Sequence, residues 1–236
     1  MKKIKHPCFG YKEVVEFESH KSKLQEKIEQ LEERISILET KDILNKLENL
    51  KSGETLDLNL TNNLINNDVK PLTIKKDTKV NLNLNNKKII VTEKDIDGFI
   101  VEENAELTIN GNGLLETADN GLGFTFIVQG KLIINSGNFK SKKDSEGKAN
   151  ACVYVKNSGV AEIYGGRFET SDGDFVLNKK DSDRATSSIL VMGGEFVEFD
   201  PSNNKSEGNN TNFVADGYKV EKFIENDKNI YRVVKA

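Results

Sequence analysis

The sequence contains no tryptophan, three prolines, two cysteines and two histidines among its 236 residues. Cys8 and Cys152 are too few for a disulfide framework, and we expect two unpaired thiols. A zinc site at His6 and Cys8 would need two further ligands, and His20 is the only other histidine, so we expect no metal site. Because both histidines precede residue 21, histidine-dependent catalysis in the rest of the sequence is excluded. No motif that binds a cofactor is present, and we expect none to be bound.

Long apolar runs are also missing. No stretch approaches the ~20 apolar residues of a membrane span, so we expect no membrane partner. The first residues, MKKIK, are basic, but the following HPCFGYKEVVEF lacks the apolar core of a secretory signal, and we expect no export by that route. A net charge of −4 and a pI near 5.5 argue against a nucleic-acid partner.

The composition is polar for a compact globule, with 36% hydrophobic and 31% charged residues. A globule of this length buries a large apolar core. We therefore expect an elongated molecule, or a core that is shared between chains.

What the sequence does contain is a repeat of about 25 residues. The segments AELTINGNGLLET (105–117), GKLIINSGNFKS (130–141) and GVAEIYGGRFET (159–170) each place a small residue before alternating apolar positions and a glycine-containing corner. Four apolar positions recur from cycle to cycle and are expected to form four ladders. They are Leu58, Leu82, Leu107, Leu132, Ala161 and Ile189; Leu60, Leu84, Ile109, Ile134, Ile163 and Val191; Ile65, Ile89, Leu114, Phe139, Phe168 and Phe196; and Ile74, Phe99, Phe124 and Val153.

This repeat indicates a mainly β protein with a parallel β-solenoid over residues 54–200, because short alternating strands recur between Gly and Asn corners. About six turns, stacked roughly 4.8 Å apart, would give a rod about 30 Å long. Phe139, Phe168 and Phe196 should then form a column inside the rod. Residues 201–236 combine a polar loop with two or three alternating runs, and we expect a C-terminal β cap there, because a solenoid end exposes apolar interior and unpaired strand edges.

Residues 14–53 show a helical pattern instead, preceded by an irregular segment at 1–13. Apolar residues alternate at gaps of three and four, which predicts a coiled-coil stalk. The expected oligomerisation seam consists of Val14, Phe17, Leu24, Ile28, Leu31, Ile35 and Leu38, with Lys21 as a polar member. After Leu38 the seam is interrupted, and Ile43, Leu47 and Leu50 resume it in a shifted phase.

The charges beside the seam favour parallel self-association. Lys27 and Arg34 occupy g positions, and Glu32 and Glu39 occupy the e positions that they would face in a parallel neighbour. The pattern does not decide between a dimer and a trimer. The alternative is a single amphipathic helix that packs on its own domain.

A short irregular head, a parallel coiled coil and a β-solenoid together resemble bacteriophage fibre, spike and capsid-decoration proteins. The ending GGEF…DPSN…FVADGYKVEK…YRV is similar to endings of β-helical repeat proteins from gut bacteria and their phages. The resemblance implies a right-handed, single-chain, pectin-lyase-like β-helix in a structural, non-enzymatic virion protein such as a head fibre, displayed on the particle surface. It also implies that residues 1–13 dock on a capsid or other virion protein, through Ile4, Pro7, Phe9 and Tyr11, and that the rod touches host-surface glycans.

Two other functions stay open. A tail spike-like, polysaccharide-degrading enzyme would use clustered carboxylates, and the best cluster is Asp172, Asp174, Asp181 and Asp183 with Arg184. We expect these to be solvated loop residues, although a carboxylate-only hydrolase is not excluded. The other alternative is a bacterial surface adhesin. Separately, Tyr154 and Tyr164 lie on neighbouring predicted turns and are candidates for an exposed strip on which sugars stack.

Overall fold

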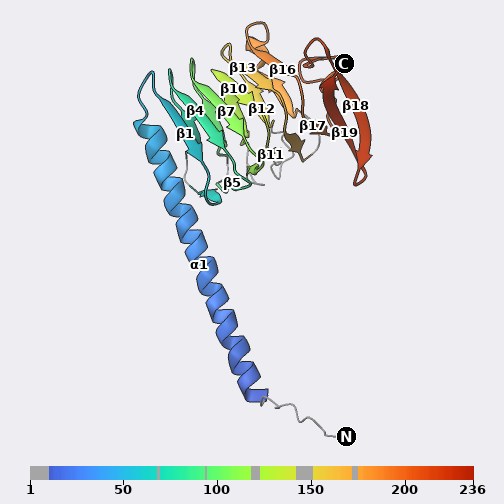
Figure 1. Ribbon diagram of the computed structural model, residues 1–236. Helices are drawn as coiled ribbons and strands as arrows, with labels where there is room; N and C mark the ends of the chain where they lie inside the picture. Colours follow the sequence, from blue (N-terminus) through green and yellow to red (C-terminus); the bar gives the residue numbers. More distant parts are fainter. Residues whose placement is uncertain (1–10, 68–69, 94, 118–122, 142–150, 172–174) are drawn as a thin grey trace.

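A computed structural model describes residues 11–67, 70–93, 95–117, 123–141, 151–171 and 175–236, with side chains from residue 20 onward. One long helix, α1 (Tyr11–Asn49), precedes a stack of short parallel strands, and an antiparallel hairpin follows the stack. The N-terminal part of α1 projects from the strands, while its C-terminal part lies against the first of them (Figure 1). The molecule is therefore mainly β, with a parallel β-solenoid as its body.

The solenoid has three parallel sheets, and each turn of the chain adds one strand to each sheet. Sheet 1 holds β1 (Thr55–Asn59), β4 (Lys79–Asn83), β7 (Glu106–Asn110), β10 (Lys131–Ile134), β13 (Val160–Ile163) and β16 (Ser188–Val191). Sheet 2 holds β2 (Leu64–Asn66), β5 (Lys88–Val91), β8 (Leu114–Glu116), β11 (Asn138–Ser141), β14 (Arg167–Thr170) and β17 (Glu195–Val197). Sheet 3 holds β3 (Leu72–Ile74), β6 (Phe99–Val101), β9 (Phe126–Val128), β12 (Val153–Val155) and β15 (Leu177–Lys179). The described strands thus make five complete turns and two strands of a sixth.

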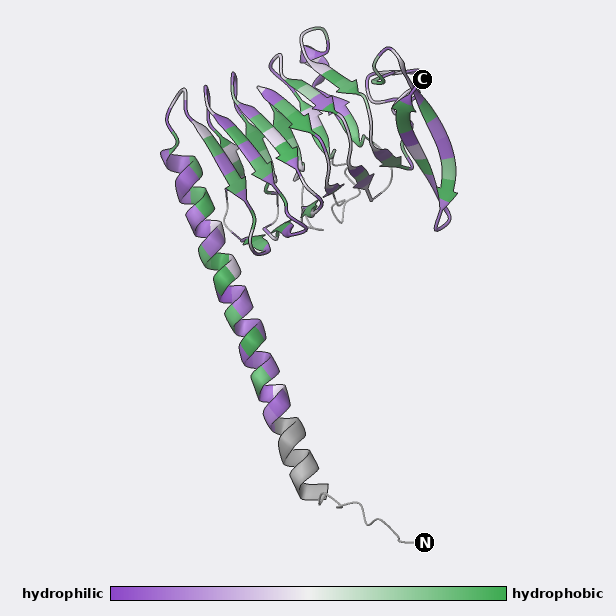
Figure 2. Ribbon diagram, in the orientation of Figure 1, coloured by the Kyte–Doolittle hydropathy of each residue, from purple (hydrophilic) through white to green (hydrophobic). Residues whose placement is uncertain are grey.

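The interior is built from stacked side chains of equivalent positions. In sheet 2, Phe139 pairs with Phe168 and Phe168 with Phe196, as the repeat predicts. All three rings are buried. Figure 2 shows the alternation along the strands, where apolar residues are interspersed with polar ones.

The predicted register is wrong in part of the early turns. Leu58 pairs with Leu82, but Leu82 pairs with Ile109 rather than with Leu107. A shift of two residues keeps a side chain on the same face of a strand, so the apolar pattern cannot detect it. In sheet 3 the same error places Ile74 and Phe124 in a ladder that actually contains Leu72 and Phe126.

Sheet 2 carries a different error. Leu64 and Leu115, rather than Ile65 and Leu114, lie in the ladder with Ile89. Ile65 and Leu114 are only half-buried. Adjacent apolar residues such as Ile65 and Leu64 leave the inward-facing position ambiguous in the sequence.

The last two corners between sheets 1 and 2 each contain a glycine pair, Gly165–Gly166 and Gly193–Gly194. Gly166 and Gly194 have φ values of +97° and +99°, a region that favours glycine. The preceding Gly193 is restricted by space, because a Cβ atom there would lie 2.1 Å from the carbonyl oxygen of Tyr164. Each turn can therefore lie directly on the previous one at this corner.

The C-terminal hairpin consists of β18 (Tyr218–Glu225) and β19 (Lys228–Lys235). β19 pairs antiparallel with β17, so the hairpin extends sheet 2. The turn residues Asn226 and Asp227 have φ values of 50° and 61°, which matches the type I′ turn of tight hairpins. None of the helical sequence that the structure describes forms an apolar stretch of the length needed to cross a bilayer.

Candidate functional site

The described part of the predicted seam is exposed on the projecting helix. Leu24 and Leu38 are 61% and 66% exposed, and the seam residues between them are also exposed: Ile28, Leu31 and Ile35. The side chains of Val14 and Phe17 lie outside the described residues. Five large apolar side chains in water on one helix face are unusual for a helix that packs only on its own domain.

A second face of α1 packs on the solenoid. Ile43 and Leu47 are buried in the core with the first turn, and Ser36 and Thr40 are buried beside them. The hydroxyl of Thr40 donates to the carbonyl oxygen of Ser36 at 2.8 Å and lies 3.4 Å from that of Ile65. At 100° per residue, this face is centred about 130° around the helix from the seam. The phase shift after Leu38 therefore separates two apolar faces of one helix.

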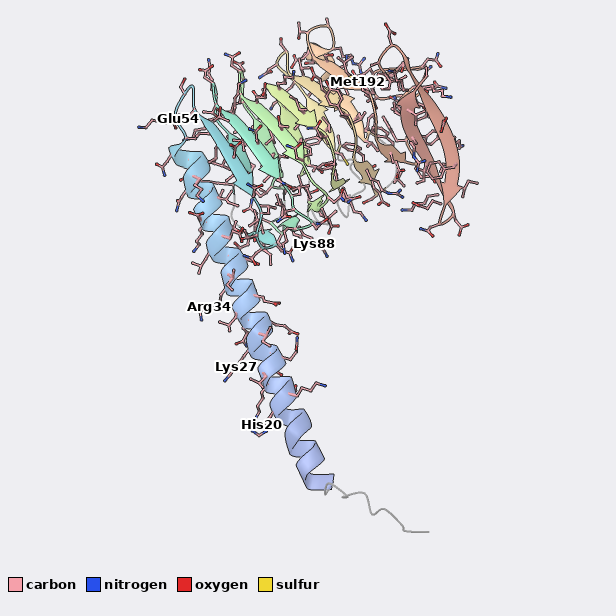
Figure 3. The ribbon with its side chains drawn as sticks, in the orientation of Figure 1. His20, Lys27, Arg34, Glu54, Lys88 and Met192 are labelled. Atoms are coloured by element: carbon pink, nitrogen blue, oxygen red, sulfur yellow. The ribbon has the colours of Figure 1, made fainter. Side chains whose placement is uncertain are left out.

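Of the charged residues beside the seam, Glu39 already has hydrogen-bond partners in the solenoid. Figure 3 shows Lys27 and Arg34 projecting from the same side of α1. Glu39, however, accepts hydrogen bonds from the backbone N–H of Thr61 at 3.1 Å and from the side-chain amide of Asn62 at 2.8 Å. Burial alone would raise the pKa of Glu39, but these hydrogen bonds outweigh it and lower the pKa. An Arg34 from a neighbouring chain would have to share this carboxylate with the solenoid.

The described members of the acidic cluster are hydrogen-bonded within the chain. Asp181 accepts a hydrogen bond from the guanidinium of Arg184 at 2.8 Å. Asp183 accepts hydrogen bonds from the backbone N–H of Asn157 at 2.8 Å and from the hydroxyl of Ser182. The hydrogen bond from Asn157 is the main cause that lowers the pKa of Asp183. A general acid needs the opposite shift. Asp172 and Asp174 lie outside the described residues.

Tyr154 and Tyr164 do not form one strip. Tyr154 lies on β12 of sheet 3, where its ring stacks on Phe124 at 4.7 Å. Tyr164 follows β13 of sheet 1 and donates its hydroxyl to Glu162 at 3.3 Å. The two rings belong to different sides of the solenoid, so they cannot stack on one sugar chain together.

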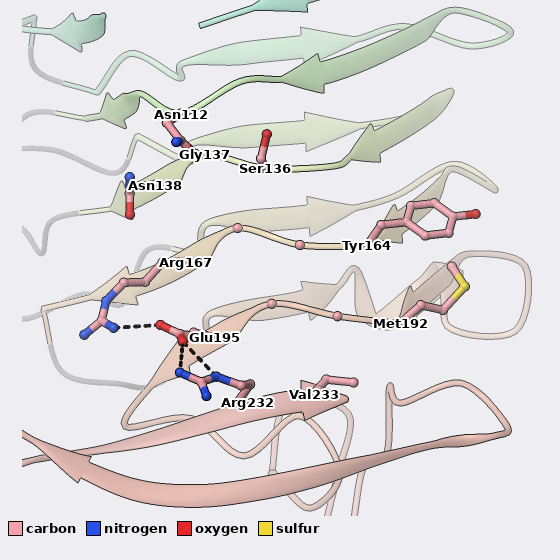
Figure 4. Close-up of a pocket in the computed structure, with 14 residues that line it drawn as sticks. Asn112, Ser136, Gly137, Asn138, Tyr164, Arg167, Met192, Glu195, Arg232 and Val233 are labelled. Atoms are coloured by element: carbon pink, nitrogen blue, oxygen red, sulfur yellow. Dashed lines mark hydrogen bonds and ion pairs between the residues drawn. The ribbon is translucent and has the colours of Figure 1, made fainter. Parts of the chain in front are cut away.

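A groove of about 500 Å³ runs along the glycine corners of the last turns. Tyr164 and Met192 lie on one side of it, and Arg167, Glu195 and Arg232 lie on the other (Figure 4). Glu195 accepts hydrogen bonds from Arg167 at 2.9 Å and from Arg232 at 2.6 Å. Burial alone would raise the pKa of Glu195, but the two arginines outweigh burial and hold the pKa below its ordinary value.

A second ion cluster lies beside this groove on the outer face of sheet 2. Glu169 pairs with Lys140 at 3.3 Å and with Lys228 of the hairpin at 2.5 Å. Both clusters therefore tie the hairpin to the solenoid, and their charges are largely satisfied within the chain. These clusters could not be predicted from the sequence, because the contacts of Arg232 and Lys228 depend on the pairing of β19 with β17.

None of the residues that the structure describes forms a group of three or more His, Cys, Asp or Glu side chains able to hold a metal ion. Of the expected docking residues, Ile4, Pro7 and Phe9 lie outside the described residues, and Tyr11 is described only as the first residue of α1. The chain matches no protein-family model, no curated protein and no solved structure.

Proposed function

We propose that the chain is a structural fibre or decoration protein of a bacteriophage virion, assembled through α1 as a parallel homo-oligomer of two or three copies. The observation that carries the assembly is the exposed seam, which faces away from the chain's own solenoid while a separate face of the helix packs on it. Exposed apolar stripes of this kind mark interaction surfaces. A second copy of the chain is the occupant that fits, because each seam is complementary to itself at heptad spacing.

The charges support a parallel arrangement. In that arrangement Lys27 faces Glu32 of the neighbour, whereas an antiparallel pairing sets like charges against each other. All solenoids then extend from the same end of the coiled coil. The resulting oligomer would carry two or three solenoids on one coiled coil.

The two ends of each rod support a structural role. The C-terminal part of α1 lies on the first turn, and the β18–β19 hairpin extends sheet 2 beyond the last one. We propose that the hairpin is the C-terminal cap, because it covers the strand edge that β17 would otherwise expose.

Attachment to the virion is proposed for residues 1–13, on the resemblance to phage fibres, with Ile4, Pro7, Phe9 and Tyr11 as the contact residues. The test uses particles purified by density gradient from lysates of the bacterium whose DNA encodes the chain. We expect the full chain in the particle fraction. A chain that lacks residues 1–13 should be absent from particles and should still oligomerise.

Two outcomes would contradict the proposal. Normal incorporation of the truncated chain would remove the docking role, and a chain found in the bacterial envelope instead of in particles would favour the surface-adhesin alternative. Release of reducing ends from capsular polysaccharide, lost when Asp181 or Asp183 is replaced by Asn, would favour the enzyme alternative.

A further inference from the structure

A hollow of about 290 Å³ is lined by Phe175 before β15, by residues after β17 and by Tyr231 of β19. Figure 1 shows β17 and β19 at the end of the solenoid remote from α1. We call this cavity the terminal hollow and define it by six lining residues. Its apolar side is formed by Phe175, Phe199 and Tyr231, and its polar side includes Glu198, Asp200 and Asn203. Ligand sites commonly combine a concave apolar wall with a few polar groups that fix orientation.

Two of these residues have a strained backbone. Phe175 and Glu198 have φ values of 49° and 55°. Within the described ranges, every other non-glycine residue with positive φ is Asn, Asp or Ser, and Asn and Asp tolerate this conformation well. A bulky residue there is a genuine outlier, and such outliers gather at binding and catalytic sites. Both outliers of the described chain line the same hollow.

The strain at Glu198 has a structural explanation. Its carboxylate accepts hydrogen bonds from the backbone N–H of Asn229 at 2.6 Å and from the side-chain amide of Asn229 at 2.9 Å. These contacts fix the end of β17 to the hairpin. Phe175 is 38% exposed, so it is accessible to solvent rather than buried in the core.

The polar side of the hollow is held in place. Oδ1 of Asp200 accepts from the backbone N–H of Ser202 at 2.9 Å and from its hydroxyl at 2.7 Å. These bonds orient the carboxylate and leave Oδ2 for another donor. Asn203 is exposed at the rim and carries both an amide donor and a carbonyl acceptor.

An exposed aromatic face beside a fixed carboxylate and a free amide matches the chemistry of a sugar ring. The C–H face of a pyranose is apolar and suits the negative face of an aromatic ring, while its hydroxyls donate to a carboxylate and exchange hydrogen bonds with an amide. The ammonium of Lys222 already lies 5.2 Å from the centroid of the Tyr231 ring, so Phe175 offers the open face. We propose that the terminal hollow binds one saccharide ring, stacked on Phe175 and hydrogen-bonded to Asp200 and Asn203.

The test is saturation-transfer difference NMR on the full chain. The probes are the methyl glycosides of glucose, galactose, N-acetylglucosamine and rhamnose, each at millimolar concentration. We expect transfer to the ring C–H protons of at least one glycoside. Phe175→Gly should abolish this signal and leave the melting temperature unchanged or raised, because glycine relieves the strain of positive φ. Phe175→Tyr should retain the signal, and so should the control Tyr164→Ala, which removes an exposed ring outside the hollow.

Three results would overturn the inference. They are no transfer to any glycoside, loss of transfer in Tyr164→Ala but not in Phe175→Gly, and transfer to a pool of short peptides in place of the glycosides. The inference does not depend on the stalk. An Ile28→Asp monomer should give the same transfer signal, so failure of the oligomer and failure of the saccharide site are distinguishable.

Discussion

The rings of Phe168 and Phe196 stack in the solenoid core with their centroids 5.0 Å apart and their planes inclined by only 9°. Phe139 continues the column at the same centroid distance from Phe168. Phe168 therefore has an aromatic neighbour on each side, from the turn before and from the turn after. Removing the Phe168 ring would therefore leave a cavity bordered by both the preceding and the following turn.

We expect Phe168→Ala to lower the free energy of unfolding by about 3–5 kcal/mol, the range for buried aromatic rings that leave a cavity. The matched control is Tyr164→Ala, four residues earlier and 47% exposed. It should change the free energy of unfolding by less than about 0.5 kcal/mol. Urea denaturation followed by circular dichroism measures both, and equal effects would show that the column does not stabilise the rod.

The tight corner at Gly193 leads to a second prediction. Gly193→Ala places a Cβ atom 2.1 Å from the carbonyl oxygen of Tyr164, so neighbouring turns must separate. Gly53→Ala provides the comparison, because a Cβ atom there meets nothing within 4 Å and only the φ of +84° is unfavourable. We expect Gly53→Ala to cost about 1 kcal/mol, and Gly193→Ala to cost clearly more in the same urea assay. A smaller cost at Gly193 would mean that the stack can open there at little expense.

The aromatic column and the repeat were predictable because a solenoid stacks like residues on like. Phe139, Phe168 and Phe196 sit in cycles where a glycine corner fixes the count from strand to strand. The register of Leu82 was not predictable, because sliding a strand by two residues keeps every inward side chain inward. The terminal hollow could not be predicted either, since Phe175 and Tyr231 lie far apart in the sequence and meet only through the hairpin.

The seam on α1 leads to a third prediction, on assembly. Ile28→Asp places a charge in the centre of the exposed stripe and should convert the oligomer to monomers, since a buried unpaired carboxylate is costly. Gln30→Asp adds the same charge on the same helical turn, at an exposed position outside the seam, and should leave the oligomer intact. Sedimentation equilibrium measures the mass of each variant. A monomeric wild-type chain, or an unchanged Ile28→Asp oligomer, would refute the coiled coil.

The ion clusters around Glu195 and Glu169 lead to a fourth prediction, that the hairpin detaches more readily from the solenoid at acid pH. The pKa values of Glu195 and Glu169 are both lowered from their ordinary value of 4.5. For both groups burial alone would raise the pKa, and the bonded arginines or lysines outweigh it. A lowered pKa in the folded state stabilises the fold above the unfolded pKa, and this contribution is lost as the pH falls through the lowered value. The sensitive range therefore lies below pH 4.5.

Hydrogen exchange of the β19 amides, corrected for the intrinsic pH dependence of exchange, measures this effect. In the wild-type chain, protection should fall as the pH is lowered below 4.5, through the lowered pKa values of Glu195 and Glu169. In Glu195→Gln the protection should already be lower at neutral pH and should change less with acid. An identical acid response in both chains would show that Glu195 does not hold the hairpin.

The thiol of Cys152 provides a probe of unfolding. It is fully buried, and burial raises its pKa to about 12. Its Sγ lies 3.5 Å from the carbonyl oxygen of Phe139 and 3.4 Å from that of Glu169. In a Cys8→Ser chain we expect no reaction with a disulfide reagent near about pH 8 until the solenoid unfolds, because only an accessible thiolate reacts. Rapid labelling of the folded chain would mean that the middle turns open readily.

In the proposed oligomer, the angle around α1 between the exposed seam and the face packed on the solenoid sets the direction in which each solenoid points from the coiled coil. One residue inserted between Leu38 and Ile43 would rotate the solenoid by about 100° around the axis of the coiled coil, because an α-helix turns by that angle per residue. Seven inserted residues would raise it by about 10 Å and change its heading by only about 20°. Inserted heptads would therefore change mainly the distance of the solenoid along the helix axis. Single inserted residues would change mainly its angle around that axis.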